Sequence, residues 1–126
     1  MKHKRLLLAG LFCLFCSLIT LISCKKNAGC TGVIFTHTVN EQTGVKTPIG
    51  GCKLVIGDTT FADDIYREVV TDASGYYEGK WSREVYLLVE ATKDLNEEEY
   101  YYGIGYIHLE TGNTTELSIP LGLKKH

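Results

Sequence analysis

Short runs in which apolar and polar residues alternate dominate the chain after residue 29. Such runs predict β-strands, because successive side chains of a strand point to opposite faces. Seven runs qualify: residues 31–38, 52–57, 66–71, 76–81, 85–91, 101–109 and 115–119. Turn residues separate them at intervals of about ten, and helical periodicity of useful length is missing. The pattern predicts an all-β fold, a single antiparallel β-sandwich of about seven strands.

Two segments between the predicted strands carry strong turn signals. Residues 72–75 read Asp-Ala-Ser-Gly, with aspartate first and glycine last, as tight turns prefer. Thr111, Gly112 and Asn113 separate the last two predicted strands. A short glycine- and asparagine-containing connection of this kind predicts a hairpin.

The first 23 residues have the pattern of an export signal. A basic head at 1–5 precedes an uncharged apolar run at 6–22, the two parts that a helical signal peptide needs. A permanent membrane-spanning helix is the competing interpretation, and it needs about 20 apolar residues. Ser17 and Thr20 weaken the run further. We therefore expect 1–23 to be removed.

The end of this segment, Leu21-Ile22-Ser23-Cys24, resembles the lipobox of bacterial lipoproteins. The resemblance implies that Cys24 is acylated and becomes the new N-terminus. Several acyl chains, at about 0.8 kcal/mol per buried methylene, hold a protein on a membrane. Lys25 stands where the inner-membrane retention signal of the family has aspartate. The resemblance thus implies an outer-membrane lipoprotein of the cell envelope, with its domain facing the periplasm.

The expected organisation is a signal peptide at 1–23, a lipidated tether at 24–29 and one β-sandwich domain at 30–126. A chain that is 44% hydrophobic and 22% charged is typical of a globular protein. The leader holds three basic residues (Lys2, Lys4, Arg5) and no acid, so the remainder is more acidic than the formal net charge of −2. This balance argues against a nucleic-acid partner, which requires clustered basic residues.

Two cysteines, Cys30 and Cys52, remain once Cys24 is acylated. An even number in an oxidising compartment suggests a disulfide. If 31–38 and 52–57 pair as antiparallel neighbours, however, the two cysteines lie near opposite ends of the pair, and a bridge needs α-carbons within about 7 Å. Both alternatives stay open.

We expect no metal and no other cofactor. Outside the leader, whose apolar run contains Cys13 and Cys16, the sequence has neither the CxxC nor the HxxxH spacing of a metal site. Asp58, Asp63 and Asp64 lie close together but lack the DxDxDG spacing of a calcium loop, which favours a solvated loop.

Several segments together resemble a carboxypeptidase regulatory-like domain: Gly32-Val33, Gly44, Pro48, Gly51, Leu54-Val55-Ile56, Thr71-Asp72-Ala73-Ser74-Gly75-Tyr76-Tyr77 and Tyr86-Leu87-Leu88-Val89. The resemblance implies a transthyretin-like, or prealbumin-like, β-sandwich. In that family such domains are non-catalytic, accompany larger enzymes or receptors, and support folding or contact. The segment Trp81-Ser82-Arg83-Glu84 departs from the family, which usually has glycine there.

Aromatic residues supply the candidate ligand contacts. Tyr100, Tyr102 and Tyr106 lie on one face of their predicted strand, while Tyr101 joins the opposite face. With Trp81, these three tyrosines could stack on sugars or contact a protein. The alternative is that they only cover the edge of the sandwich, with their hydroxyls in water.

Three functions follow from these observations. The leading hypothesis is a lipid-anchored envelope protein with a non-catalytic module for structural support or protein interaction, whose partner is an unidentified envelope protein. The alternative is a carbohydrate-binding lipoprotein. The second alternative is a small transthyretin-like hydrolase that uses His37, His108 and an arginine, Arg67 or Arg83, although the Tyr-Arg-Gly-Ser motif of hydroxyisourate hydrolase is missing.

Overall fold

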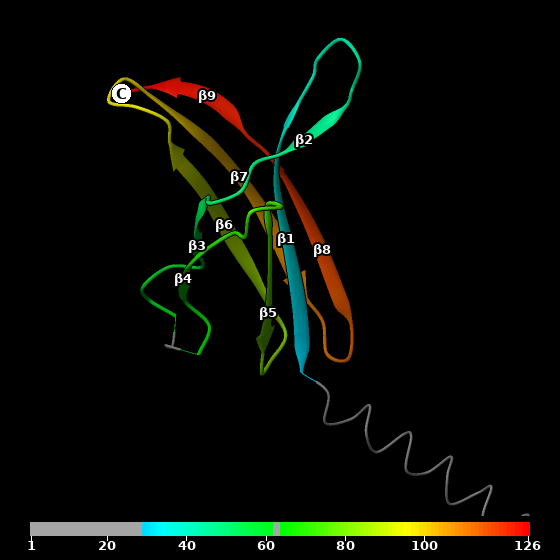
Figure 1. The fold of residues 1–126 in the computed structure, drawn as a ribbon. Helices are drawn as coiled ribbons and strands as arrows, with labels where there is room; N and C mark the ends of the chain where they lie inside the picture. The colour runs from blue at the N-terminus through cyan, green and yellow to red at the C-terminus, as the bar shows by residue number, and fades with distance from the viewer. Residues whose placement is uncertain (1–28, 62–63) are drawn as a thin grey trace, which may run out of the picture.

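A computed structural model describes residues 29–61 and 64–126, which form nine strands and no helix. The predicted signal peptide and Cys24 lie outside these residues. The strands are β1 (Cys30–Val39), β2 (Lys46–Pro48), β3 (Lys53–Ile56), β4 (Arg67–Val70), β5 (Tyr76–Trp81), β6 (Val85–Asp94), β7 (Glu99–Leu109), β8 (Thr114–Pro120) and β9 (Gly122–Lys125). They make two facing sheets (Figure 1), so the predicted all-β sandwich is confirmed.

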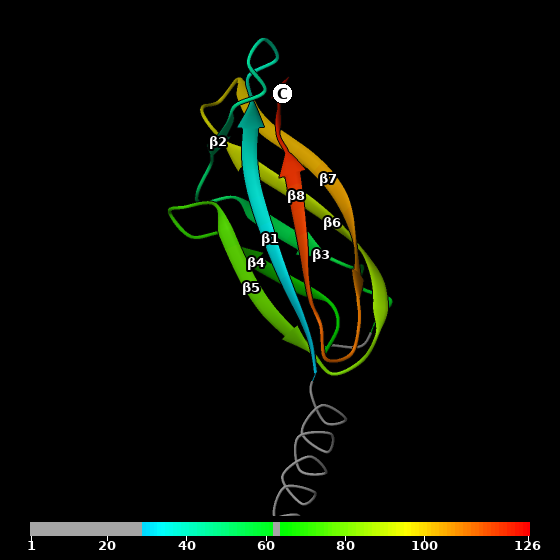
Figure 2. The ribbon, with the colours of Figure 1, turned by 90° about the vertical axis from the view of Figure 1, so that its right-hand side faces the viewer.

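The two sheets are built differently. One has five antiparallel strands in the order β4-β3-β6-β7-β9. The other has four strands with β1 in the middle. There β5 and β2 follow one another along one side of β1, and β8 lies along the other side (Figure 2). β8 runs parallel to β1, which the expectation of a purely antiparallel sandwich did not include.

Two short strands, β2 and β9, were not predicted. Their residues are exposed on both faces, so they show no alternation of apolar and polar side chains. Only backbone pairing, of β2 with β1 and of β9 with β7, makes them strands. Tertiary pairing of this kind leaves no periodic signal in a sequence.

The predicted hairpin between the last two long strands is wrong, although its turn is present. Asn113 N–H donates to the Glu110 carbonyl at 3.2 Å, and Gly112 has a φ of +76°. β7, however, pairs with β6 and β9, whereas β8 pairs with β1 in the other sheet. The turn therefore carries the chain from one sheet to the other.

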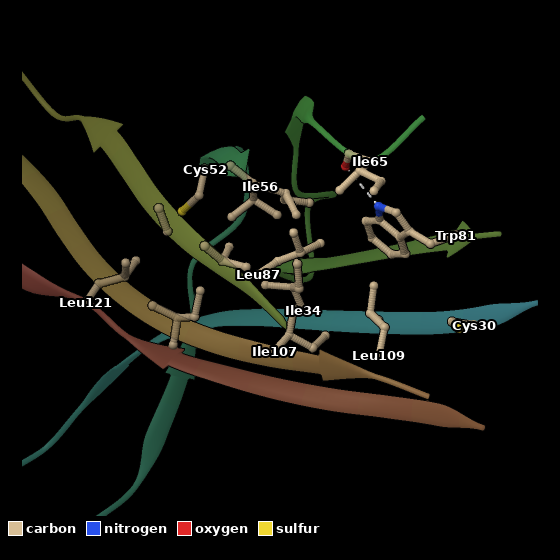
Figure 3. Close-up of a cluster of buried hydrophobic side chains, with 14 residues drawn as sticks. Cys30, Ile34, Cys52, Ile56, Ile65, Trp81, Leu87, Ile107, Leu109 and Leu121 are labelled. Carbon is tan, nitrogen blue, oxygen red and sulfur yellow. Dashed lines mark hydrogen bonds between the residues drawn. The ribbon is translucent and has the colours of Figure 1, made fainter. Parts of the chain in front are cut away.

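The core lies between the sheets and takes alternate residues from the long strands (Figure 3). Its fully buried members include Ile34, Leu54, Ile56, Leu87, Val89, Ile107, Leu109 and Ile119. Leu87 and Val89 of β6 point inward together, as do Ile107 and Leu109 of β7. Every other side chain of β6 and β7 must therefore point away from the core.

Arg67 joins the edge strands β4 and β5 across one open side of the sandwich. Its guanidinium lies 4.1 Å from the ring centroid of Trp81, a cation–π contact, and it donates to the Lys80 carbonyl. A β-carbon at Gly79 would lie 2.8 Å from the Arg67 Nη1 atom. Glycine at that position therefore leaves the space that this contact requires.

The buried Thr36 on β1 contacts two of the five segments that cross between the sheets. Its Oγ1 lies 2.7 Å from the Ile49 carbonyl and 3.2 Å from the Gly75 carbonyl. Its backbone N–H donates to Gly75 at 2.8 Å, and its carbonyl accepts from Ile49 at 3.0 Å. Residues 49–52 lead from β2 to β3, and residues 71–75 lead from β4 to β5. These two crossings are thus fixed at one side chain.

The predicted turn at residues 72–75 is confirmed. Gly75 N–H donates to the Asp72 carbonyl at 3.0 Å, and the Asp72 carboxylate accepts from Ser74 and Tyr76 N–H groups at 2.9 and 3.0 Å. Gly75 has a φ of +83°, which favours glycine. A β-carbon there would lie 2.6 Å from the Thr36 carbonyl oxygen, so the turn is also pressed against β1.

Cys30 and Cys52 are both buried free thiols, so the disulfide alternative is not realised in this structure. Cys30 pairs with Trp81 at the start of β1, whereas the Cys52 thiol donates to the Ile49 carbonyl at 3.4 Å, next to Thr36. Along β1, six residues separate the level of Cys30 from the level of Thr36, where Cys52 lies. Six residues of a strand span about 20 Å. The two thiols lie far apart in Figure 3, well beyond bonding reach.

Replacing Gly75 should cost much more stability than replacing Gly44, although both have positive φ values, +83° and +72°. Nothing lies within 4 Å of a β-carbon built at Gly44. Gly44→Ala should therefore cost only the backbone strain, about 1 kcal/mol. Gly75→Ala adds the clash with Thr36 and should lower the free energy of unfolding by at least about 2 kcal/mol more. Urea denaturation of both variants measures the difference, and equal midpoints would contradict the packing of this turn.

Candidate binding face

The outer face of the five-stranded sheet carries exposed aromatic and aliphatic side chains from β6 and β7. We call this surface the tyrosine face, and it consists of Tyr86, Leu88, Tyr100, Tyr102, Ile104, Tyr106 and His108. These residues alternate with the buried positions of the two strands, so one periodic pattern builds the core and this face together.

The pairing of β6 with β7 brings the members of the tyrosine face side by side. Tyr86 is opposite His108, and Leu88 is opposite Tyr106. The rings of Tyr86 and His108 stack with centroids 3.9 Å apart and planes 5° apart. Directly opposed residues of an antiparallel pair contact one another in this way. The result is a continuous aromatic and aliphatic row across two strands.

The centre of the tyrosine face is large and open to solvent. Tyr106 is 69% exposed, Tyr86 68% and Ile104 48%. Because a buried aromatic residue removes about 150–250 Å² from water, these three side chains alone leave on the order of 300 Å² uncovered. Continuous apolar patches of that size on a monomer are typical of interaction sites.

Polar and ionisable groups lie beside this apolar centre, toward the end of β6 and the start of β7. Glu90 is opposite Ile104, and Asp94 is opposite Tyr100. His126 lies above Tyr100, with ring centroids 4.5 Å apart, and its Nε2 is 3.5 Å from the Asp94 carboxylate. The face therefore has an apolar middle and a polar border, the arrangement found in protein–protein interfaces.

The structure places the four predicted ligand contacts differently from one another. Tyr100, Tyr102 and Tyr106 share the tyrosine face as predicted, but only Tyr106 is strongly exposed, and the first two are half-buried. Trp81 does not belong to the site, and this part of the prediction is wrong. It is 2% exposed in the core, and its Nε1 donates to the Ile65 carbonyl at 3.0 Å (Figure 3).

Two central members of the face, Tyr86 and Ile104, were not among the predicted ligand contacts. Both could have been found from alternation. Tyr86 lies between the inward positions Val85 and Leu87, and Ile104 shares the parity of Tyr102 and Tyr106. Their importance comes from the pairing of β6 with β7, which single-strand patterns do not reveal.

The groups proposed for a hydrolase do not meet. His108 lies on the outer face of the five-stranded sheet, while His37 belongs to β1 in the other sheet, stacked on Phe35 with centroids 5.0 Å apart. Arg67 covers Trp81, and Arg83 lies 3.9 Å from Asp64 in a loop. The described part of the chain thus contains no assembled histidine–arginine group.

The acidic loop after β3 uses its carboxylates internally. Asp58 accepts hydrogen bonds from the Thr60 hydroxyl and the Thr60 backbone N–H, and these hold the pKa of Asp58 below its usual value. Asp64 accepts from Ser82 at 3.2 Å. Asp63 lies outside the described residues. Among residues 29–61 and 64–126, no group of three or more His, Cys, Asp or Glu is placed to hold a metal ion.

The chain matches no protein-family model and no curated protein sequence. No helix long and apolar enough to cross a membrane occurs in the part of the chain that the structure describes. Cys24, the predicted lipidation site, lies outside that part.

The fluorescence of Trp81 should be shielded from solvent. Trp81 is the only tryptophan, so the emission at tryptophan wavelengths reports this residue alone. Because it is buried and covered by Arg67, iodide should quench it several-fold less in the folded chain than in urea. Equal quenching in both states would contradict the burial of Trp81 and would make Trp81 a candidate ligand contact again.

Proposed function

We propose that this chain is a lipid-anchored protein of the cell envelope whose β-sandwich is a non-catalytic interaction module. In this proposal the tyrosine face binds a partner protein. The observation that carries the proposal is the exposure of Tyr86, Ile104 and Tyr106 beside one another on a well-paired sheet. Tyrosine is enriched in the buried centres of protein interfaces, where it supplies much of the binding energy.

The tyrosine face suits binding because it is held in place before a partner arrives. β6 and β7 pair over ten consecutive positions, and their other sides pack in the core. Binding therefore orders few additional side chains, which reduces its entropic cost. The polar border of Glu90, Asp94 and His126 would set the orientation of the partner.

The membrane anchor in this proposal is the acylated Cys24, by resemblance to bacterial lipoproteins. A chain from Cys24 to Cys30 spans at most about 22 Å. The module would therefore stay close to the lipid surface, on the periplasmic side of the outer membrane. The resemblance to carboxypeptidase regulatory-like domains agrees with a module that supports or contacts another protein.

Binding of a glycan is the second candidate for the same face. This candidate is favoured because the face carries tyrosines in place of aliphatic residues. It is also favoured because carboxylates lie directly opposite members of the face. Glu90 and Asp94 could accept hydrogen bonds from sugar hydroxyls while tyrosine rings contact the sugar carbons. The acidic surroundings exclude strongly anionic glycans from this candidate.

Substituting Tyr86→Ser and Tyr106→Ser together should abolish partner capture without unfolding the domain. Both side chains are mostly exposed, so each change should alter the free energy of unfolding by no more than about 0.5 kcal/mol. The measurement is mild cross-linking in intact cells, followed by purification from solubilised membranes. Tyr76→Ser, an exposed tyrosine of the other sheet, is the matched control and should keep the captured protein.

The same variants separate the two candidates. A protein captured by the wild type and the control, but lost from the double variant, supports the protein interface. Recovery of the bare monomer in every case, with soluble envelope glycans broadening the NMR signals of the Tyr106 ring, supports the glycan. If no protein is captured and no glycan broadens the Tyr106 signals, the tyrosine face is rejected as a binding site.

Cys24→Ser should release the protein from the membrane. The thioether needs the cysteine sulfur, so the variant should lose the acyl mass and move from the membrane to the soluble fraction. Mass spectrometry of the intact membrane-bound protein measures the acyl chains directly. An unmodified thiol at Cys24 on a chain that keeps residues 1–23 would contradict the anchor.

A further inference from the structure

The two sheets leave five strands with a side that pairs with no other strand of the described chain, and four of these edges are protected. β9 carries Lys124 and Lys125. β2 has only three residues, including Lys46 and Pro48. Lysine, proline and short length are the usual means of preventing edge pairing.

The edges of β4 and β5 are protected together. Arg67 of β4 donates to the Lys80 carbonyl of β5 and covers Trp81. This contact closes the side of the sandwich on which both strands lie. A segment pairing with β5 would have to displace it.

The edge of β8 is less protected than the other four, although the Thr115 hydroxyl donates to the His108 carbonyl of β7, in the facing sheet, at 3.0 Å. β8 has seven residues, pairs only with β1, and contains no lysine or arginine. Its single proline, Pro120, is the last residue of the strand. On the side away from β1, the alternate N–H and C=O groups of residues 114–119 have no backbone partner in the described part of the chain. An edge of this kind is a ready template for another strand.

The side chains of β8 specify what could pair there. Glu116 is exposed on the outer face and has no ion-pair partner among residues 29–61 and 64–126. Leu117 points between the sheets but is only partly buried. A strand added beside β8 would bury Leu117 further if it presented an apolar side chain inward, and would neutralise Glu116 if it presented a cation outward.

We infer that the free edge of β8 accepts an extended segment of a partner protein as an additional strand, in which a lysine or arginine faces Glu116 and apolar side chains alternate with it. Main-chain hydrogen bonds would supply the affinity, and the alternating side chains the specificity. A second copy of this chain fits less well. Its β8 would bring another Glu116 to the same face and no cation.

This edge is separate from the tyrosine face, which belongs to the opposite sheet. The inference therefore does not depend on the function proposed above. It can hold if the tyrosine face binds nothing, and it can fail while that face binds its partner.

The test uses two short synthetic peptides of alternating threonine and valine, one with a central lysine and one with a central glutamate. Amide hydrogen exchange, followed by NMR on the wild-type protein, should show protection of Glu116 and Ser118 by the lysine peptide, whereas Leu117 N–H points toward β1 and should change little. The glutamate peptide should bind about two- to fivefold more weakly, as expected for an exposed charge pair. Glu116→Lys should reverse this preference.

Glu78→Lys is the matched control. Glu78 and Glu116 both lie directly opposite Val33, on the same face but at the two edges of the sheet. The control should keep the wild-type preference, and so should the double tyrosine variant of the previous section. Protection that appears on β4, β5 or β9 instead of β8 would overturn the inference. So would a preference that Glu116→Lys leaves unchanged, or a β8-linked dimer of the free protein in sedimentation.

Discussion

The side chain of Thr36 connects the first two of the five places where the described chain crosses from one sheet to the other. Its hydroxyl lies within hydrogen-bond distance of Ile49 in the first crossing and of Gly75 in the second. Thr71, beside it at 3.5 Å, accepts the N–H of Cys52 at 2.9 Å. Because these groups are buried, an unpaired member would cost about 1–3 kcal/mol. The pairing therefore fixes how the sheets lie over one another.

This fixed arrangement explains where the sandwich carries the two surfaces proposed to bind other molecules. The long ladder of β6 and β7 has one side in the core, so the alternation that buries Leu87 and Ile107 also places Tyr86 and Tyr106 in solvent. In the other sheet, β1 is used on both sides, and its last neighbour β8 keeps an open edge. The tyrosine face and the β8 edge are thus two consequences of one packing arrangement.

Periodicity in the sequence identified what depends on alternation and local turns. All seven predicted strands exist, the predicted tight turn at 72–75 is present, and Tyr100, Tyr102 and Tyr106 share a face. What periodicity could not identify depends on pairing between distant segments. β2 and β9 have no alternation of apolar and polar side chains, and β8 pairs with β1 and not with β7, its neighbour in sequence.

Trp81 illustrates the same limit at the level of one residue. An aromatic side chain at the end of a strand suits a ligand platform as well as a core. Only the positions of Arg67 and Ile65, from a different part of the chain, place Trp81 in the core. The disulfide was undecided for a related reason. The distance between Cys30 and Cys52 depends on the assignment of their strands to different sheets.

Native-state hydrogen exchange at the amides around Thr36 tests this account most directly. The N–H groups of Thr36, Ile49 and Cys52 all donate within this buried group. If the group holds the sheets together, these amides should exchange only through global unfolding, with the same free energy as the slowest amides of β6 and β7. Exchange through local opening, with a free energy well below that of the β6–β7 ladder, would show that the sheets are held by other contacts.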